Sequence, residues 1–399
     1  MSTSIYLDNS ATTAVRSEVQ EAMKPYLSDK WGNPSSVHYY GAQARKALDE
    51  SRKGLAQMLN CEEDEVYFTP SGTYSNNVAL LGRARFAEAN GKGKHLITTR
   101  IEHSSCMGPA RHLEALGWEV TYLPVNCEGV VDPAELEKAI KKETSIVSIM
   151  WANNEVGSVQ PLQELAQIAA AREVFFHTDA VQVPGKLKID LKELPVDSLS
   201  VSGHKFYAPK GIGALFVRRG SNVMPLVFGG GQERGLFPGT EPVALAVAIG
   251  TAAKLAALEL AAETEALRKM GHILVSGLTA IDGVKLSGPQ TWERRIPGHV
   301  SIILPGLEGE AVVMQADMRG LCISSASACH KGITRPSHVV TSLCFTDAEA
   351  IGSIRMTAGR FNTEDECTKA VELMDKIIAT LRRSNANASC SAVESRQPA

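Results

Sequence analysis

The chain reads Val196-Asp197-Ser198-Leu199-Ser200-Val201-Ser202-Gly203-His204-Lys205, an apolar run that ends in a short polar segment with a lysine. The run predicts a buried strand, and the polar residues predict the turn that follows it. A lysine at the mouth of a buried strand is partly desolvated, which lowers its pKa and frees its amine to attack an aldehyde. Lys205 is therefore a candidate Schiff-base lysine. The alternative is an ordinary surface lysine, since Lys186 and Lys210 occur in the same region.

Short apolar runs alternate with helical patterns on both sides of this stretch. Strands are predicted at residues 65–68, 95–98, 118–123, 146–150, 174–177 and 196–201, with helices at 77–81, 110–116, 133–140 and 162–171 between them. A further strand at 211–219 is a candidate antiparallel neighbour. This regular order predicts an α/β fold with a mostly parallel sheet that helices cover on both faces.

The 399 residues exceed what one core usually holds, roughly 250–300 residues, so two domains are expected. We predict an N-terminal segment at 1–14 that packs with the small domain, a large domain at 15–256, a smaller α+β domain at 257–383, and a disordered polar tail at 384–399. A long alanine- and leucine-rich helix from about residue 243 to 269 would bridge the two domains.

Composition narrows the class of function. The formal charge of -3 and a pI near 6.4 show no excess of positive charge. This argues against direct binding to nucleic acid and against binding to an anionic membrane surface. No apolar run reaches the roughly 18–20 residues that span a bilayer. The eight cysteines are scattered, which argues against a zinc site or a disulfide framework and for a reducing compartment. We expect a cytoplasmic small-molecule enzyme without a metal site.

Polar residues follow several of the predicted strands, at the edge where parallel sheets bind ligands. Ser71-Gly72-Thr73 forms a glycine turn that opens a helix and suits a phosphate. His103 follows the next strand and can stack on a flat ring or carry a proton, and Asn154 offers an amide to a ring hydroxyl or a carboxylate. Taken singly, an ordinary helix cap, a capping histidine and a turn former explain these residues equally well.

Asp179 is the sharper signal, because a carboxylate at the end of a buried strand is costly unless it meets a cation. A protonated pyridine nitrogen supplies one. Asp179 and Lys205 end successive strands and can face one aromatic ring. A phosphate cradle, a stacking ring, a partner for the nitrogen and an aldehyde-trapping lysine together specify pyridoxal 5'-phosphate.

On these residues the chain resembles the cysteine desulfurases, in the aminotransferase class V superfamily of fold-type I pyridoxal-phosphate enzymes. The match runs nearly end to end and leaves out only the tail after Arg383. Its motifs are Tyr6 to Thr13, Gly32-Asn33-Pro34-Ser35-Ser36-Val37-His38, Ser71-Gly72-Thr73, Ser202-Gly203-His204-Lys205, Pro209-Lys210-Gly211-Ile212-Gly213, Gly229-Gly230-Gly231-Gln232-Glu233-Arg234-Gly235 and Ser324-Ser325-Ala326-Ser327-Ala328-Cys329.

The resemblance implies a role for each matching residue. Lys205 would form the Schiff base, Asp179 would pair with the pyridine nitrogen, and His103 would stack on the ring and is a candidate proton carrier. The other implied cofactor contacts are Asn154 and Gln182 to oxygens and Gly72, Thr73, Ser202 and His204 to the phosphate, with Thr240 completing the phosphate site of the neighbouring subunit of a homodimer. The implied substrate contacts are Arg355, which would grip the carboxylate of L-cysteine, with Asn154 and Asn33.

Cys329 matches the family's nucleophile. It lies in a stretch of small residues followed by His330-Lys331, and nearby cations favour thiolate over thiol. From its residues alone this stretch also fits an inert loop, with Cys322 or Cys344 as equal candidates. The resemblance implies that Cys329 takes sulfur from L-cysteine as a persulfide, releasing alanine, and that a long mobile loop passes the sulfur to acceptor or scaffold proteins.

The chain departs from the family pattern at a few positions. Phe237-Pro238 stands where an arginine is usual, Tyr74 and Asn76 stand where acidic residues are common, and His330-Lys331 is unusually basic. Selenocysteine lyase or another class V activity is the nearest alternative, and a non-catalytic scaffold is a second. The sequence does not decide among iron–sulfur cluster assembly, tRNA thiolation and DNA phosphorothioation as the destination of the sulfur.

Overall fold

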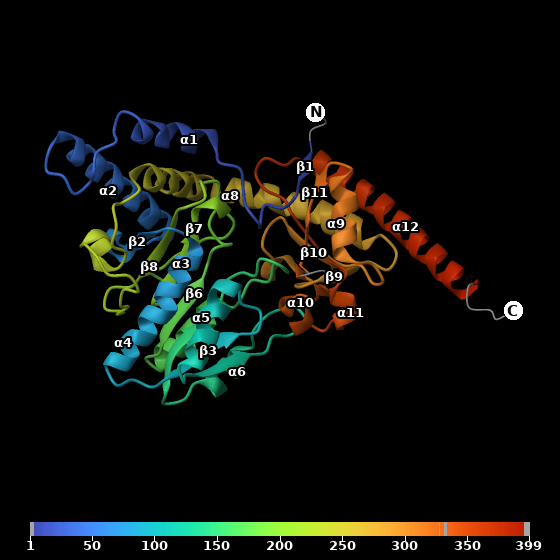
Figure 1. Cartoon of the computed structure of the whole chain (residues 1–399), viewed down its shortest axis with the longest axis horizontal. Coiled ribbons are helices and arrows are strands. Elements are labelled where there is room, and N and C mark those ends of the chain that lie inside the picture. The colour runs from blue at the N-terminus through green and yellow to red at the C-terminus, as the bar shows by residue number, and fades with distance from the viewer. Residues whose placement is uncertain (1–3, 327, 331–332, 395–399) are drawn as a thin grey trace.

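The computed structural model of the chain describes residues 4–326, 328–330 and 333–394 (Figure 1). A seven-stranded sheet forms its centre, in the order β2-β8-β7-β6-β5-β3-β4. Its strands are β2 (Val66–Thr69), β3 (His95–Thr99), β4 (Glu119–Leu123), β5 (Thr144–Ser148), β6 (Phe175–Asp179), β7 (Ser198–Ser202) and β8 (Gly213–Val217). Only β8 runs against its neighbours in this sheet. The predicted mostly parallel α/β sheet and the antiparallel neighbour are confirmed.

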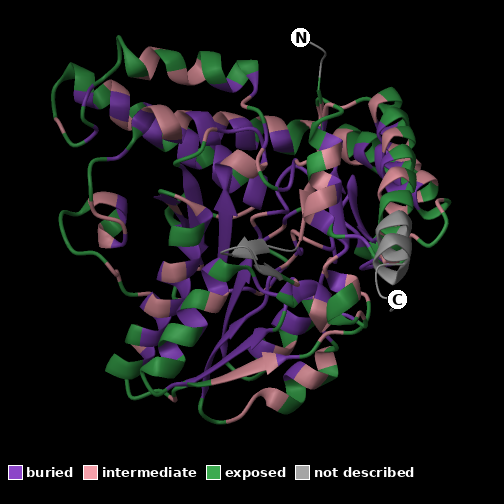
Figure 2. Ribbon diagram, turned by 45° about the vertical axis from the view of Figure 1, so that its right-hand side comes forward, coloured by how far each residue is buried: buried purple, intermediate pink, exposed green. Residues whose placement is uncertain are grey.

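Helices cover both faces of this sheet, and successive strand residues alternate between them. Leu96, Ile146 and Phe175 pack toward α4 (Arg83–Ala89) and α5 (Ser104–Ala115). Their chain neighbours Ile97, Val147 and Phe176 pack into the core on the other face. The helices of that second face include α2 (Tyr39–Leu59), α6 (Pro133–Ala139), α7 (Leu162–Ala171) and the first half of α8 (Val243–Thr279). Because both faces are apolar, β3, β5, β6, β7 and β8 are buried along their length (Figure 2), as continuous apolar runs predict, whereas the edge strand β4 is only partly buried.

The remaining elements of the large unit are short. They are α1 (Ser17–Met23), α3 (Gly72–Asn77), which continues through the π-helical η3 (Val78–Gly82) into α4, and the turns η1 (Lys24–Leu27), η2 (Glu63–Glu65), η4 (Gly203–Lys205) and η5 (Gln232–Gly235).

A smaller α+β unit follows in the sequence, shown in orange and red in Figure 1. Its antiparallel sheet has the order β12-β15-β10-β9. The elements are β9 (Lys285–Ser287), η6 (Trp292–Arg294), β10 (His299–Ile303), α9 (Gly309–Asp317), β11 (Leu321–Cys322), β12 (Ser324–Ser325), β13 (Ala328–His330), β14 (Ile333–Arg335), α10 (His338–Ser342), α11 (Asp347–Ala350), β15 (Ser353–Thr357) and α12 (Glu364–Glu394). The N-terminal strand β1 (Ile5–Tyr6) pairs with β11, and Leu7 lies in the core of this unit.

Helix α8 joins the two units. Its residues from Ala246 to Ala256 belong to the core of the large sheet, whereas Leu267, Met270 and Leu274 belong to the smaller core. The boundary predicted after residue 256 therefore falls within this helix. An 18-residue window of α8 is apolar enough to cross a membrane, with a mean hydropathy of 1.8, and 44% of that window is buried in the fold. Length and composition alone do not separate such a core helix from a membrane span.

Two expectations need correction. The tail predicted to be disordered from Ser384 continues α12 as far as Glu394. Extending an existing helix costs far less than nucleating one, and this stretch has neither glycine nor proline to end it. The expectation of no disulfide is also wrong, because Cys127 and Cys344 are bonded, with Cα atoms 4.9 Å apart across 217 positions of sequence. Sequence spacing cannot reveal a pair that only the fold brings together.

Candidate active site

A cavity of ≈ 220 Å³ opens at the carboxyl ends of the parallel strands. Each wall comes from a segment that directly follows or ends a strand, as expected for a parallel sheet. The lining residues are Ser71, Gly72, Thr73, His103, Ser105, Met150, Ala152, Asn154, Asp179, Val181, Gln182, Ser202, His204 and Lys205. Nine predicted cofactor contacts thus meet in one cavity, and they include the candidate Schiff-base lysine.

Lys205 lies in η4, directly after β7. Its Nζ donates to the carbonyl oxygens of Ser10 and Ala11, at 2.6 and 2.8 Å. Burial, together with the positive charges of Arg355 and Lys186, lowers the pKa of Lys205 to about 8. An amine with this pKa is partly neutral near physiological pH and can attack a carbonyl carbon. The sequence interpretation of Lys205 therefore has a physical basis in the fold.

Asp179, at the end of β6, and His103, after β3, line the same cavity. The carboxylate of Asp179 is 5% exposed and accepts from the backbone N–H of Val181 at 2.9 Å and from Nδ2 of Asn76 at 2.7 Å. His103 caps α5, with Nδ1 accepting from the backbone N–H of Ser105 at 3.2 Å. Asp179 can thus offer an oxygen to a ring N–H, and the exposed His103 ring is open to the cavity.

The phosphate end is formed by the start of α3 and the turn after β7. Ser71 caps the helix by accepting from the N–H of Tyr74, and the first N–H groups of a helix have no partner within it. A Cβ atom at Gly72 would lie 2.7 Å from Val181 and 3.2 Å from Ser202, so only glycine fits here. Burial lowers the pKa of His204 to about 4, so this ring is neutral beside the site.

Gln182 and Asn154 line the cavity, and Arg355 of the smaller unit bonds to the backbone of Asn154. Nε2 of Gln182 donates to the carbonyl oxygen of Ser10 at 3.1 Å, whereas its Oε1 is buried without a hydrogen-bond partner. Arg355, on β15, donates to the backbone oxygen of Asn154 at 2.9 Å and to Asp8 at 2.7 Å. The unpaired oxygen of Gln182 and the guanidinium of Arg355 are available to a polar ligand placed between the two units.

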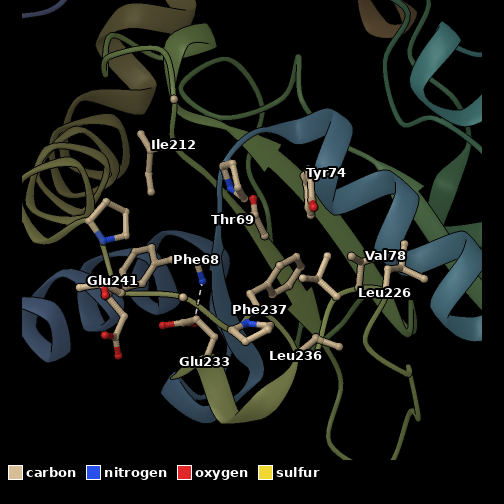
Figure 3. Close-up of a pocket in the computed structure, with 17 residues that line it drawn as sticks. Phe68, Thr69, Tyr74, Val78, Ile212, Leu226, Glu233, Leu236, Phe237 and Glu241 are labelled. Carbon is tan, nitrogen blue, oxygen red and sulfur yellow. Dashed lines mark hydrogen bonds between the residues drawn. The ribbon is translucent and has the colours of Figure 1, made fainter. Parts of the chain in front are cut away.

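Among the side chains that the structure describes, three predicted site residues do not line this cavity: Arg355, described above, Asn33 and Thr240. Asn33 is exposed and accepts from the N–H of Ser35, and it does not line the cavity. Thr240 lines a second cavity of ≈ 310 Å³ (Figure 3). The rings of Tyr74 and Phe237 in its wall have centroids 6.3 Å apart, so two departures from the family pattern contact each other.

Cys329 lies in a short hairpin, where β13 and β14 pair Cys329 with Thr334. The structure thus has paired strands where the sequence predicts an irregular loop, and the side chain of Cys329 lies outside its described part. Among the residues described, no three His, Cys, Asp or Glu side chains come together as a metal site.

Sequence reasoning missed several residues of the site. Glu102, beside His103, is fully buried, and burial raises its pKa to about 8. Its Oε1 accepts from Thr99 at 2.8 Å and from the N–H of Met150 at 2.9 Å, so it joins two strand ends. Like Asp179, it is a carboxylate that follows a buried strand, which is the signal that could have identified it. Lys186, taken above as an ordinary lysine, is only 7% exposed.

Comparison with known proteins shows the family to which the chain belongs. The family model described as aminotransferase class-V matches residues 5–369. The chain belongs to this family. Within class V, it is 43% identical over 383 residues to the cysteine desulfurase IscS of Dictyoglomus turgidum, covering 96% of each protein.

Solved structures of class V proteins agree with the fold. A NifS-like protein matches with a TM-score of 0.88 and 34% identity, over 94% of this chain and 100% of that one. The structure of SspA in complex with cysteine matches with a TM-score of 0.77 and 35% identity, over 90% of this chain and 99% of that one. Class V enzymes depend on pyridoxal phosphate, and the cavity fits it in its amine, its carboxylate, its glycine-lined helix start and the unpaired oxygen of Gln182.

Proposed function

We propose that this protein is a pyridoxal-phosphate-dependent cysteine desulfurase, which takes sulfur from L-cysteine, releases L-alanine and leaves a persulfide on Cys329. One observation carries the proposal: Lys205, with its pKa lowered to about 8, shares one cavity with Asp179 in a chain that matches IscS over 96% of its length. The amine and the carboxylate suit the cofactor, and the relatives indicate the substrate.

When bound, the cofactor supplies an aldehyde for a Schiff base and a ring that accepts electrons. Lys205 would hold that aldehyde and, as a free amine, would take the proton from the substrate Cα atom. Asp179 would accept a hydrogen bond from the ring N–H and favour a positive charge on that nitrogen. Gly72, Thr73, Ser202 and His204 would hold the phosphate, Asn154 and Gln182 would bind ring oxygens, and His103 would stack on the ring.

The sulfur transfer itself takes place at Cys329. Its thiolate attacks the substrate sulfur, and a new S–S bond forms as the C–S bond breaks. The electron pair of the broken bond stays with the carbon, which takes up a proton to become the methyl group of alanine. The cationic residues His330-Lys331 beside Cys329 favour the thiolate that this attack needs.

We assign the substrate carboxylate to Arg355, because the planar guanidinium matches a carboxylate with two parallel hydrogen bonds. In the structure the guanidinium of Arg355 already donates hydrogen bonds to Asp8 and to the carbonyl oxygen of Asn154. L-cysteine would take over part of these contacts when it binds. Asn33 is assigned as a further substrate contact that reaches the site in the assembled enzyme.

We also propose a homodimer, in which Thr240 of each subunit completes the phosphate site of the other. The position of Thr240 outside the cofactor cavity of its own chain is consistent with this role. The persulfide is then passed to acceptor or scaffold proteins for iron–sulfur cluster assembly, tRNA thiolation or DNA phosphorothioation. The slight negative charge supports protein partners over direct nucleic-acid contact. We also propose a cytoplasmic location, which the free thiols at Cys61, Cys106, Cys322 and Cys367 support and the Cys127–Cys344 disulfide opposes.

The test compares purified wild type with Cys329→Ala, using Cys322→Ala as the matched control. The absorption spectrum reports bound cofactor, and alanine and sulfide are measured from L-cysteine with a thiol reductant present. Wild type and Cys322→Ala should form alanine and sulfide in step, whereas Cys329→Ala should bind cofactor but lose activity by on the order of 10³-fold or more. Full activity in Cys329→Ala would instead indicate another class V reaction, and selenocysteine as the preferred substrate would indicate a lyase.

A further inference from the structure

Two residues outside the predicted site, Asn76 and Ser105, connect His103 to Asp179. Nδ2 of Asn76 lies 2.7 Å from Oδ2 of Asp179 and 2.8 Å from Oγ of Ser105. Oγ of Ser105 lies in turn 2.7 Å from Nδ1 of His103. Asn76, Ser105 and Asp179 are 1%, 6% and 5% exposed. The four side chains form one continuous and largely buried row of hydrogen bonds.

The directions of the hydrogen bonds in this row follow from the carboxylate at one end and from a backbone N–H at the other. An ionised carboxylate only accepts, so the amide of Asn76 must turn its NH2 group toward Asp179. The second hydrogen of that NH2 group is then donated to Oγ of Ser105. This oxygen can accept two hydrogen bonds, so the amide alone does not direct the hydroxyl proton. The backbone N–H of Ser105 donates to Nδ1 of His103 at 3.2 Å, which makes Nδ1 an acceptor and directs the hydroxyl proton of Ser105 to it as well.

Nδ1 of His103 therefore receives two donors and carries no proton. The ring proton of the neutral imidazole lies on Nε2. A base needs a free lone pair, and the remaining lone pair of this tautomer is the one engaged by Ser105. In this state His103 is a hydrogen-bond donor through Nε2.

We propose that Asn76 and Ser105 are positioning residues that fix His103 as the Nε2–H tautomer and hold Asp179 as an oriented acceptor. This inference rests on the proposed function, in which His103 and Asp179 contact the same ring. It makes His103 a donor to the ligand side of the cavity and leaves abstraction of the Cα proton to Lys205. One row of hydrogen bonds thus orients both His103, which stacks on the ring, and Asp179, which contacts the ring nitrogen.

The experiment determines the tautomer in the holoenzyme labelled with ¹⁵N-histidine, by two-bond ¹⁵N–¹H correlation, with the His103 signal assigned from a His103→Gln sample. Wild type should show the Nε2–H pattern. Ser105→Ala removes the hydroxyl donor at 2.7 Å and keeps only the longer backbone N–H donor at 3.2 Å, so the share of the Nδ1–H form should rise. Asn76→Asp supplies an acceptor to Ser105, so Oγ turns to donate toward residue 76 and should also shift His103 toward Nδ1–H.

Two further variants act as controls. Ser104→Ala makes the same change at an exposed neighbour on the same helix and should leave the tautomer as in wild type. Ser105→Thr keeps a hydroxyl and should restore the Nε2–H pattern. The visible circular dichroism of the bound cofactor should change in Asn76→Asp, whose Asp179 loses its donor, and not in Ser104→Ala. For Ser105→Ala, kcat should fall roughly 3- to 10-fold, the factor for one lost hydrogen bond.

An Nδ1–H or doubly protonated His103 in wild type would overturn the proposal, as would an unchanged tautomer in both Ser105→Ala and Asn76→Asp. These measurements do not depend on the reaction that is catalysed. A protein that turns over L-cysteine without Cys329 but shows the expected tautomers would therefore contradict the proposed function alone.

Discussion

Lys186 is buried and Lys205 is half-buried in the candidate cofactor cavity, and their hydrogen bonds differ. Nζ of Lys205 has two carbonyl acceptors at 2.6 and 2.8 Å. Nζ of Lys186 has only long contacts, 3.4 Å to the carbonyl oxygen of Gln182 and 3.5 Å to that of Lys205. Burial lowers the pKa of Lys186 to about 8, although Glu263 opposes the effect. The amine of Lys186 is thus a desolvated cation with weak compensation.

Replacing this amine should stabilise the protein in a pH-dependent way. The pKa of Lys186 is about 8 in the fold, against an ordinary value of 10.5, so between these values the unfolded chain binds the extra proton. The cost of the buried charge is therefore fully present below pH 8 and fades as the pH rises toward 10.5. Lys186→Met should raise the free energy of unfolding by about 1–3 kcal/mol at neutral pH, with the gain shrinking in alkali.

Denaturant unfolding of Lys186→Met across that pH range gives the measurement. Lys210→Met makes the same substitution at an exposed position and should change little at any pH. A destabilised Lys186→Met at neutral pH would mean that the charge is compensated, which would contradict the argument from burial.

At the scale of elements, the segment around η5 holds an unusual backbone. Glu233 and Arg234 have φ values of 45° and 54°, a left-handed conformation that non-glycine residues rarely adopt. Glu233 is anchored by Arg52, whose guanidinium donates to both carboxylate oxygens at 2.6 and 2.8 Å. The N–H of Phe68 also donates to Glu233, at 2.8 Å. This buried pair fixes the segment that leads to Thr240.

Arg52→Met should therefore be strongly destabilising. It leaves the Glu233 carboxylate, 7% exposed, without its cation, and breaking one partner of a buried pair typically costs about 3–5 kcal/mol. Arg219→Met is the matched control, because Arg219 makes a similar two-point contact with Asp64 on the surface and should cost less than about 1 kcal/mol. Equal losses in the two variants, measured by denaturant unfolding, would show that burial is not what matters.

Elements also mark the limit of sequence reasoning. The strands of the large sheet were predictable because both faces are apolar, which gives continuous runs such as Ile146 to Met150. Helix α2 was missed, since its buried stripe consists largely of small residues such as Ala44, Ala47 and Gly54, which pack where α8 approaches closely. Strand β15 was missed because it holds the charged Arg355 in a buried run.

The grouping of the candidate site residues in one cavity was predictable for a similar reason. Its residues follow strands whose order the sequence makes clear, so Asp179 and Lys205 are placed by topology. Asn76 and Ser105 lie inside helices, where the sequence does not show which side chain turns toward the site. Their role depends on distances between α3, α5 and β6 that only the fold sets.

At the scale of the molecule, two of the contacts that join the two units bear on the site. One is α8, which contributes to both cores. The other is an apolar cluster in which Ile101 and Met150 of the large unit pack with Val339 and Leu343 near α10. His338 on α10 also bonds the carbonyl oxygen of Glu102, at 3.0 Å. The segment that carries Cys329 leads directly into this second contact.

The disulfide between Cys127 and Cys344 reinforces the same contact. Cys127 lies between β4 and α6 of the large unit, and Cys344 lies between α10 and α11. A bond across 217 positions restricts the unfolded chain strongly, and removal of a native disulfide typically costs about 2–4 kcal/mol. The double variant Cys127→Ser/Cys344→Ser should therefore unfold at lower denaturant than oxidised wild type, by a free energy in that range.

The redox state distinguishes this effect from ordinary packing. A thiol reductant should lower the stability of wild type to that of the double variant and leave the double variant unchanged, because only wild type has a bond to lose. Cys61→Ser, at a free thiol, should keep the response of wild type to reductant. Alkylation of both Cys127 and Cys344 in the folded, oxidised protein, detected by peptide mass, would contradict the disulfide. Sulfur transfer is assayed with reductant, so stability must be compared at the redox state of that assay before a loss of activity is attributed to Cys329.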